Sequence, residues 1–182
     1  MPARTAAEVL EFWFAAATQP NWFARSEAFD ARVRDALGPL HAQAARGELD
    51  AWASDPRGAL ALVLLLDQAP RNLHRGSADA FASDPRALKH ARAVVDAGHD
   101  TQLSELERLF LYLPFEHSES LADQDRCIEL TRALPSPQWL DYAEKHRAII
   151  ARFGRFPHRN AILGRESTAE ELEFLKQPGS SF

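Results

Sequence analysis

The fold of this chain is decided by residues 55–68, which read DPRGALALVLLLDQ. Asp55 followed by Pro56 is a typical helix start, because Asp caps free backbone N–H groups and Pro at the first helical position loses no needed donor. Residues 59–66 are all apolar. We therefore expect a helix from Pro56 to about Gln68 that lies buried at the centre of the molecule.

The same local signals recur on both sides of this segment. Thr5, Ser104 and Thr168 are each followed three residues later by Glu, which is the pattern of a capping box. Gly47 and Gly154 are typical helix ends. Helices are expected over about 5–14, 26–46, 56–68, 85–97, 104–114, 120–133, 138–153 and 168–176, with Pro39 breaking or bending the second and Pro114 ending the fifth.

Strand signals are missing from the sequence, because no segment sustains an alternation of apolar and polar residues. Short turns between successive helices make those helices antiparallel neighbours. The sequence therefore predicts one all-α domain over residues 1–182, with about eight helices, a core over about 5–176 and a frayed tail at 177–182. On the helix at 120–133, the residues expected to face inward are Leu121, Ile128 and Leu130.

The composition bounds the class of protein. The chain has 182 residues, of which 46% are apolar, and a net charge of -5. An acidic protein lacks the broad positive field that DNA or membrane surfaces require, so neither partner is expected. The start lacks a secretory pattern, and an apolar run of eight residues is far shorter than the ~20 that cross a membrane. We expect a soluble, cytoplasmic protein.

Cysteine usage excludes further site classes. Cys127 is the only cysteine, so an internal disulfide and a metal site of several cysteines are ruled out. The sequence also lacks the His-Glu-x-x-His, P-loop and Gly-x-Ser-x-Gly motifs. No motif specifies a metal, a cofactor or an oligomeric state.

Two stretches nearly repeat each other. PRNLHRG occupies residues 70–76 and PHRNAILGR occupies residues 157–165, and neither contains Asp or Glu. Each couples Pro to an Arg-Asn pair and then to Gly and Arg. Two basic, acid-free turns on an acidic protein predict a site for an anion. The donors expected to hold it are Arg71, Asn72, Arg155, His158, Arg159 and Asn160.

The same arginines also have a structural interpretation. Asp67, at the end of an apolar helix, needs a partner and could pair with an Arg to lock the first turn. The arginines of the second turn could likewise clamp the helices through carboxylates elsewhere in the chain. Both interpretations stay open for Arg71, whereas Phe153 and Phe156, just before the second turn, are expected in the core.

A second candidate constellation follows the expected helix at 104–114. His117 and Glu119 could act as an acid–base pair, since imidazole titrates near neutral pH and a neighbouring carboxylate tunes it. The alternative is that Ser118 or Ser120 caps the next helix while Glu119 favours its positive end. His146, on the helix that leads into the second basic turn, is a further candidate for a functional residue.

Four segments of this sequence resemble the DUF924 family, small and mainly bacterial proteins of unknown function. The segments are VLEFWF (9–14), LLDQAPRN (65–72), FLYLPFEHSE (110–119) and RFGRFPHRN (152–160). The resemblance runs from Val9 to about Leu175 and implies an all-helical, TPR-like fold with no established activity. Ala69 departs from the aromatic residue that the resemblance leads us to expect there.

Three functions are compatible with these features. The first is a protein that binds a phosphate- or carboxylate-bearing small molecule in a polar Arg/Asn/His pocket. The second is a TPR-like module that holds a peptide or protein partner in an open groove without catalysis. RNA binding through the second basic turn ranks last, because the chain as a whole is acidic.

Overall fold

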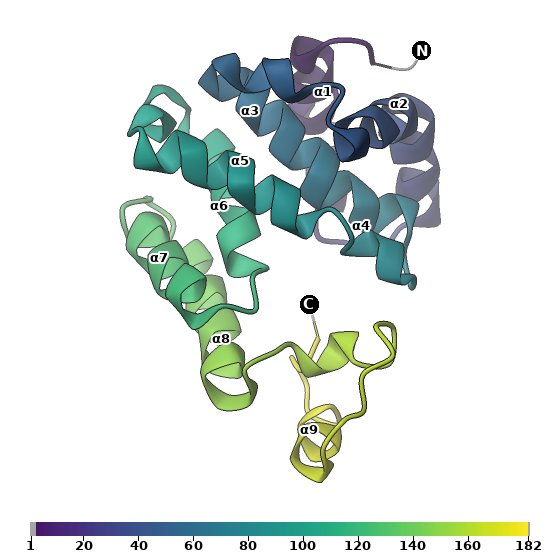
Figure 1. The fold of residues 1–182 in the computed structure, drawn as a ribbon, viewed down its shortest axis with the longest axis vertical. Coiled ribbons are helices and arrows are strands. Elements are labelled where there is room, and N and C mark those ends of the chain that lie inside the picture. Colours follow the sequence, from purple (N-terminus) through teal and green to yellow (C-terminus); the bar gives the residue numbers. More distant parts are fainter. Residues whose placement is uncertain (1–2, 182) are drawn as a thin grey trace. The chain divides into compact units, whose positions relative to one another are not determined.

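The computed structural model describes residues 3–181, which contain helices and no β-strand (Figure 1). The all-α prediction is therefore confirmed. The chain falls into two compact units, Met1–Arg75 with Asp79–Pro114, and Gly76–Ala78 with Phe115–Phe182. A single domain over 1–182 and a TPR-like arrangement stay predictions. None of the described helices combines the length and the apolar character needed to cross a membrane.

The first unit is built around the largely apolar segment at residues 55–68. α3 (Pro56–Val63) continues through a π-helical turn (Leu64–Gln68) into α4 (Ala69–Leu73). Residues 58–70 are all buried, as predicted. Asp55 caps the start of α3, because its carboxylate accepts two backbone N–H groups at 3.0 and 3.1 Å. The helical path nevertheless runs five residues beyond the expected end at Gln68.

The π-helical turn follows from Pro70. Pro70 has no backbone N–H for the carbonyl of Leu66, so the regular helical hydrogen bond is lost there. Ser83 replaces it, since its hydroxyl donates to that carbonyl at 2.5 Å. The imidazole Nδ1 of His41 donates to the carbonyl of Leu65 at 2.8 Å. Ser83 and His41, from two other segments, thus stabilise a wide helical turn that the sequence pattern does not predict.

The remaining helices of the first unit pack around this path. They are α1 (Ala6–Phe14), α2 (Glu27–Arg46), α5 (Asp84–Asp96) and the greater part of α6 (Glu105–Glu116). α3 packs against α1 and α5, and α2 packs against α4 (Figure 1). The capping boxes at Thr5 and Ser104 are both present.

The proline predictions for these helices have different outcomes. α2 is not broken at Pro39, because Leu37 and Leu40 on either side are buried and outweigh the lost hydrogen bond, while a bend there stays a prediction. The end of α6 expected at Pro114 is wrong, because α6 continues through Pro114 and ends at Glu116. Burial of neighbouring side chains therefore overrides the local preference at both sites.

The second unit contains α7 (Leu121–Arg132), α8 (Pro137–Phe153), a 3₁₀ turn (Pro157–Arg159) and α9 (Ala169–Phe174). α7 and α8 lie side by side (Figure 1). The end of α8 packs in a small core of Ile149, Ile150 and Phe156, with Phe153 and Phe174 against it. Gly154 ends α8 with a φ of 69°, in the left-handed region that favours glycine.

The inward face of α7 differs from the prediction. Leu121 is 42% exposed, and its inward placement was wrong. The buried side chains of α7 belong to Asp123, Gln124, Cys127 and Thr131. A polar face is buried here, which requires hydrogen-bond partners inside the unit.

Ser180 lies in the segment expected to be a frayed tail, and its fraying stays a prediction. Ser180 is buried, and its hydroxyl donates to the carbonyl of Leu175 at 3.1 Å. Phe182 lies outside the described residues. The capping box at Thr168, which begins α9, is confirmed.

Candidate functional site

The first basic turn begins in α4 and continues past the end of this helix at Leu73, and its polar groups contact residues of its own unit. Arg71 donates from both terminal nitrogens to Asp84, at 2.9 and 3.0 Å, and lies 3.4 Å from a carboxylate oxygen of Asp67. Arg71 also donates to the carbonyl of Asp67. The amide of Asn72 donates to the carbonyl of Gln68 at 3.2 Å. Asp67 thus pairs with an arginine, as its structural interpretation expected.

Arg75 completes the ion pairs of the first turn. Its guanidinium donates to both carboxylate oxygens of Asp30, on α2, at 2.7 and 2.8 Å. Two arginines of this turn therefore hold carboxylates of neighbouring helices. This arrangement is what a structural clamp requires.

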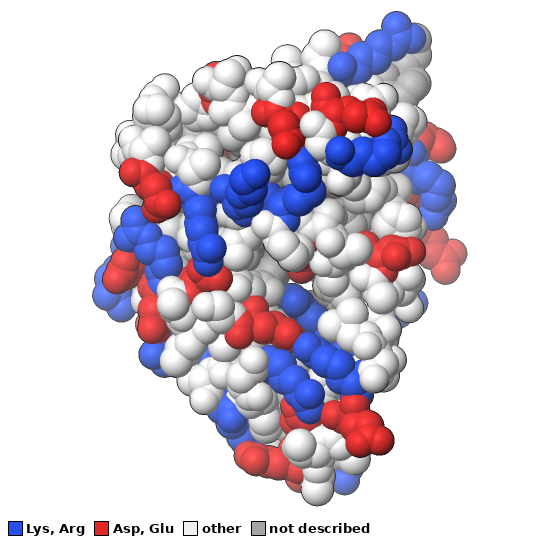
Figure 2. Space-filling model, in the orientation of Figure 1, with Lys and Arg blue, Asp and Glu red and all other residues white. Residues whose placement is uncertain are grey.

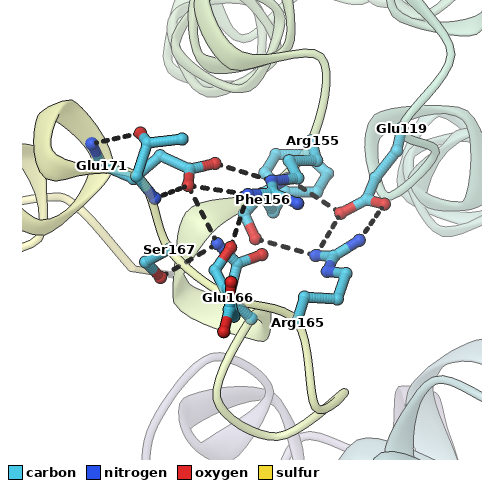
Figure 3. Close-up of polar contacts among 9 residues, drawn as sticks. Glu119, Arg155, Phe156, Arg165, Glu166, Ser167 and Glu171 are labelled. Carbon is cyan, nitrogen blue, oxygen red and sulfur yellow. Dashed lines mark hydrogen bonds and ion pairs between the residues drawn. The ribbon is translucent and has the colours of Figure 1, made fainter.

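The second basic turn contains a clamp of its own, centred on Glu171 (Figure 3). Arg155 donates to both oxygens of Glu171 at 2.6 and 2.8 Å, and the amide of Asn160 donates to it at 3.3 Å. The Thr168 backbone N–H also donates to Glu171, at 2.7 Å. These hydrogen bonds, led by those from Arg155, lower the pKa of Glu171 to about 2. Glu171, only 2% exposed, therefore stays ionised and fixes the turn.

Glu119 forms a second clamp beside the first (Figure 3). Arg165 donates to both of its oxygens at 2.7 and 2.9 Å, and the Phe156 backbone N–H donates at 2.8 Å. Burial raises the pKa of Glu119, but the hydrogen bonds from Arg165 and Phe156 outweigh burial and hold that pKa below its usual value. Glu119 is thus an ionised anchor, and its role as the base for His117 stays a prediction.

The expected caps of α7 also differ from the structure. Ser120 occupies the N-cap position but makes no side-chain capping hydrogen bond. Ser118 donates from its hydroxyl to Asp123 at 2.7 Å. Glu119 accepts hydrogen bonds from Arg165 and from the Phe156 backbone N–H, and a favourable interaction with the start of α7 stays a prediction.

Three basic side chains, His146, His158 and Arg159, lie around the ring of Phe156, and His117 lies beside His146; we call these four the histidine–arginine cluster. His146 lies 6.4 Å from His117 and 5.7 Å from Phe156, measured between ring centroids. His158 lies 5.7 Å from Phe156, and the Arg159 guanidinium lies 4.5 Å from the same ring centroid. The end of α6, α8 and the 3₁₀ turn thus each contribute to one cluster within the second unit.

His146 occupies the buried position of the cluster. Its Nδ1 donates to the carbonyl of Tyr142 at 2.8 Å and lies 3.5 Å from a carboxylate oxygen of Glu116. Burial is the main cause that lowers the pKa of His146, to about 3, and the charges of His117, His158 and Arg159 lower it further. His146 is therefore neutral at physiological pH and stands in a positive potential.

Metal and thiol chemistry find no support in the described part of the chain. Residues 3–181 hold no group of three His, Cys, Asp or Glu side chains arranged to bind a metal ion. Cys127 is buried, and burial raises the pKa of its thiol, so its reactive thiolate form is disfavoured.

Surface charges do not form one broad basic field on the face that Figure 2 shows. Lys and Arg side chains there lie beside Asp and Glu side chains. Such mixing is expected where arginines are paired with carboxylates, as at Arg86 and Asp50, 2.6 Å apart. Positive charge is therefore not concentrated in one patch on this face.

The sequence predicted most residues of the histidine–arginine cluster but not the residue that binds the chain around His117. His117, His158 and Arg159 were candidates, and His146 was held in reserve. The buried Gln124, which binds the chain around His117, was not singled out. Its spacing from Cys127 and Thr131 is helical and could have marked a buried polar stripe on α7.

Comparison with known proteins supports one assignment. No curated protein matches the chain significantly. A solved structure, described as a protein of unknown function, ATU0120, from Agrobacterium tumefaciens, is 46% identical and aligns with a TM-score of 0.89. The match covers 94% of this chain and 96% of that one. The family model described as "bacterial protein of unknown function (DUF924)" matches residues 9–179. The chain therefore belongs to the DUF924 family.

Proposed function

We propose that the second unit binds a small phosphate- or carboxylate-bearing anion at the histidine–arginine cluster. The observation that carries this proposal is the grouping of His146, His158 and Arg159 around Phe156, with His117 6.4 Å from His146. Arg159 carries a permanent positive charge, and His117 and His158 carry one when protonated, so each would attract an anion bound among them. The lowered pKa of His146, caused mainly by burial, also reflects this positive potential.

Acidic and basic groups both contribute to the charge around the cluster. Glu116 lies 3.5 Å from His146 and supplies one negative charge. Arg159 supplies a permanent positive charge, and His117 and His158, both half-buried, add charge whenever they are protonated. An anion would therefore be bound more tightly as the pH falls toward the ordinary titration range of histidine.

The size of the ligand is limited by the aromatic ring at the centre. Phe156 is fully buried in the core with Ile149 and Ile150, and Arg159 covers its face. A nucleobase needs an accessible aromatic face on which to stack. These contacts therefore favour a compact anion over a nucleotide or RNA.

The other donors named from the sequence take a structural role in this proposal. Arg155 and Asn160 hold Glu171, while Arg71 holds Asp84 and Asn72 binds its own helix. His117 is the group that we propose for any proton transfer, since it is half-buried beside the neutral His146. Glu119 then positions the second turn instead of acting as the base.

Ligand titrations of matched variants test the proposal. We expect inorganic phosphate or a dicarboxylate to raise the melting temperature of the wild-type protein beyond the effect of sodium chloride at equal ionic strength. Arg159→Gln removes a charged donor and should weaken binding about tenfold or more. Arg126→Gln is the matched control, because Arg126 forms an exposed pair with Glu129 in the same unit. Equal loss in both variants, or no shift with any anion, would contradict the proposal and favour a peptide-binding module.

A further inference from the structure

A single side chain, Gln124, holds the backbone where α6 ends. The last carbonyls of a helix have no partner within that helix. The Nε2 group of Gln124 donates to the carbonyl of Glu116 at 2.6 Å and to that of Ser118 at 2.7 Å, and lies 3.4 Å from that of Phe115. The two short hydrogen bonds are made on either side of His117. The segment that carries this histidine is thereby tied to α7.

Gln124 is in turn held rigidly. Its side chain is fully buried on the inward face of α7. The adjacent Asp123 accepts the hydroxyl of Ser118 at 2.7 Å, which adds a second tie to the same segment. Two neighbouring residues of α7 therefore fix the position of the chain that follows α6.

The burial of this amide is costly. The Oε1 atom of Gln124 is buried and has no hydrogen-bond partner among the described residues. An unsatisfied buried polar atom lowers stability. The same amide satisfies the carbonyls of Glu116 and Ser118, which an apolar side chain of similar shape would leave without these donors.

We propose that Gln124 is the positioning residue of His117. By binding the carbonyls on both sides of His117, Gln124 sets where its imidazole lies relative to His146, whose ring centroid is 6.4 Å away. The consequence for anion binding rests on the proposed function, whereas the effect on His117 itself does not. Displacing a group by about an ångström is enough to weaken a polar site strongly.

Gln124→Met tests this role, because Met has a similar length and makes no strong hydrogen bond. Two measurements are made on the folded variant: the NMR titration of the His117 imidazole, and the affinity for inorganic phosphate. We expect the His117 resonances and titration midpoint to shift, and phosphate affinity to fall about tenfold. A variant whose His117 titrates as in the wild type would overturn the proposal.

Thr131→Val is the matched control. Thr131 lies on the same buried face of α7, but its hydroxyl donates to the carbonyl of Cys127, within its own helix, at 2.7 Å. We expect this variant to lose stability without a change in the His117 titration. The same His117 shift in Thr131→Val would show a general loosening of α7 and would also overturn the proposal.

Gln124→Glu is the second variant if the methionine side chain is not accommodated. It keeps the shape of glutamine and lacks the Nε2 donors, so the His117 resonances should again shift. Unchanged resonances would count against the positioning role. If wild-type protein binds no phosphate, the proposed function fails, while the His117 titration still decides the role of Gln124.

Discussion

The two basic turns have nearly the same residues and different surroundings. In the first, Arg71 and Arg75 hold the carboxylates of Asp84 and Asp30, which lie on neighbouring helices. In the second, Arg159 lies over Phe156 beside the imidazoles of the cluster. A Pro, Arg and Asn pattern therefore specifies a basic turn, while the residues packed against the turn decide its electrostatic environment.

The largest expected effect comes from breaking the clamp of the second turn. Glu171→Ala removes the buried acceptor of Arg155 and Asn160, and should lower the free energy of unfolding by about 3 kcal/mol. Urea unfolding measures the change. Glu170→Ala is the control, because its exposed pair with Arg152 should contribute less than about 1 kcal/mol. Equal losses in the two variants would show that Glu171 is not a clamp.

A smaller loss should follow from breaking the first turn. Arg71→Met removes the hydrogen bonds to Asp84 and should cost about 2 kcal/mol in the free energy of unfolding. If the first turn is a clamp only, phosphate affinity measured by calorimetry should stay within twofold of wild type, about 0.4 kcal/mol. Loss of phosphate binding in this variant would mean that Arg71 belongs to the ligand site. The two turns would then not differ in function.

The π-helical turn before the first basic turn offers a finer test. Ser83→Ala leaves the carbonyl of Leu66 without its side-chain donor and should lower the free energy of unfolding by about 1 kcal/mol. Thermal unfolding followed by circular dichroism measures it. Ser54→Ala, an exposed serine of the same unit, should be close to neutral. A neutral Ser83→Ala would mean that the wide turn does not need this hydrogen bond.

The smallest expected effect is a change in the pH dependence of stability, which is absent at neutral pH and grows in acid. The pKa of Glu171 is about 2 in the folded state, below the ordinary 4.5 of a glutamate, chiefly because of the hydrogen bonds from Arg155. Its stabilisation is therefore fully present above pH 4.5 and is lost as the pH falls toward 2. Stability measured across this range should fall less steeply in Glu171→Gln than in wild type. Parallel pH profiles would contradict the lowered pKa.

Much of the helical layout could be predicted because its signals are local. The capping boxes at Thr5, Ser104 and Thr168 are each formed between residues three apart, and all three are present. The exceptions at Pro39 and Pro114 arise where buried neighbours outweigh a lost hydrogen bond. The buried polar face of α7 was missed because its partners are backbone carbonyls of another segment.

The candidate site could be predicted only in part. His117, His158 and Arg159 were named from residue type and spacing, and the structure brings them into one cluster with His146. Glu119 was named with His117 as an acid–base pair, whereas Arg165, which donates hydrogen bonds to it, is 46 residues away, which no local pattern reveals. The partner of each charged group was decided by the fold.

By itself, the sequence determined that this protein is all-helical, where most helices begin and end, and that it resembles the DUF924 family. These properties depend on caps, prolines, glycines and apolar runs, whose effects reach only a few residues along the chain. Only the tertiary structure decided which arginines serve as clamps and which basic groups gather around Phe156. Those outcomes depend on distances between residues far apart in the sequence, because electrostatic and hydrogen-bond energies are set by proximity in space.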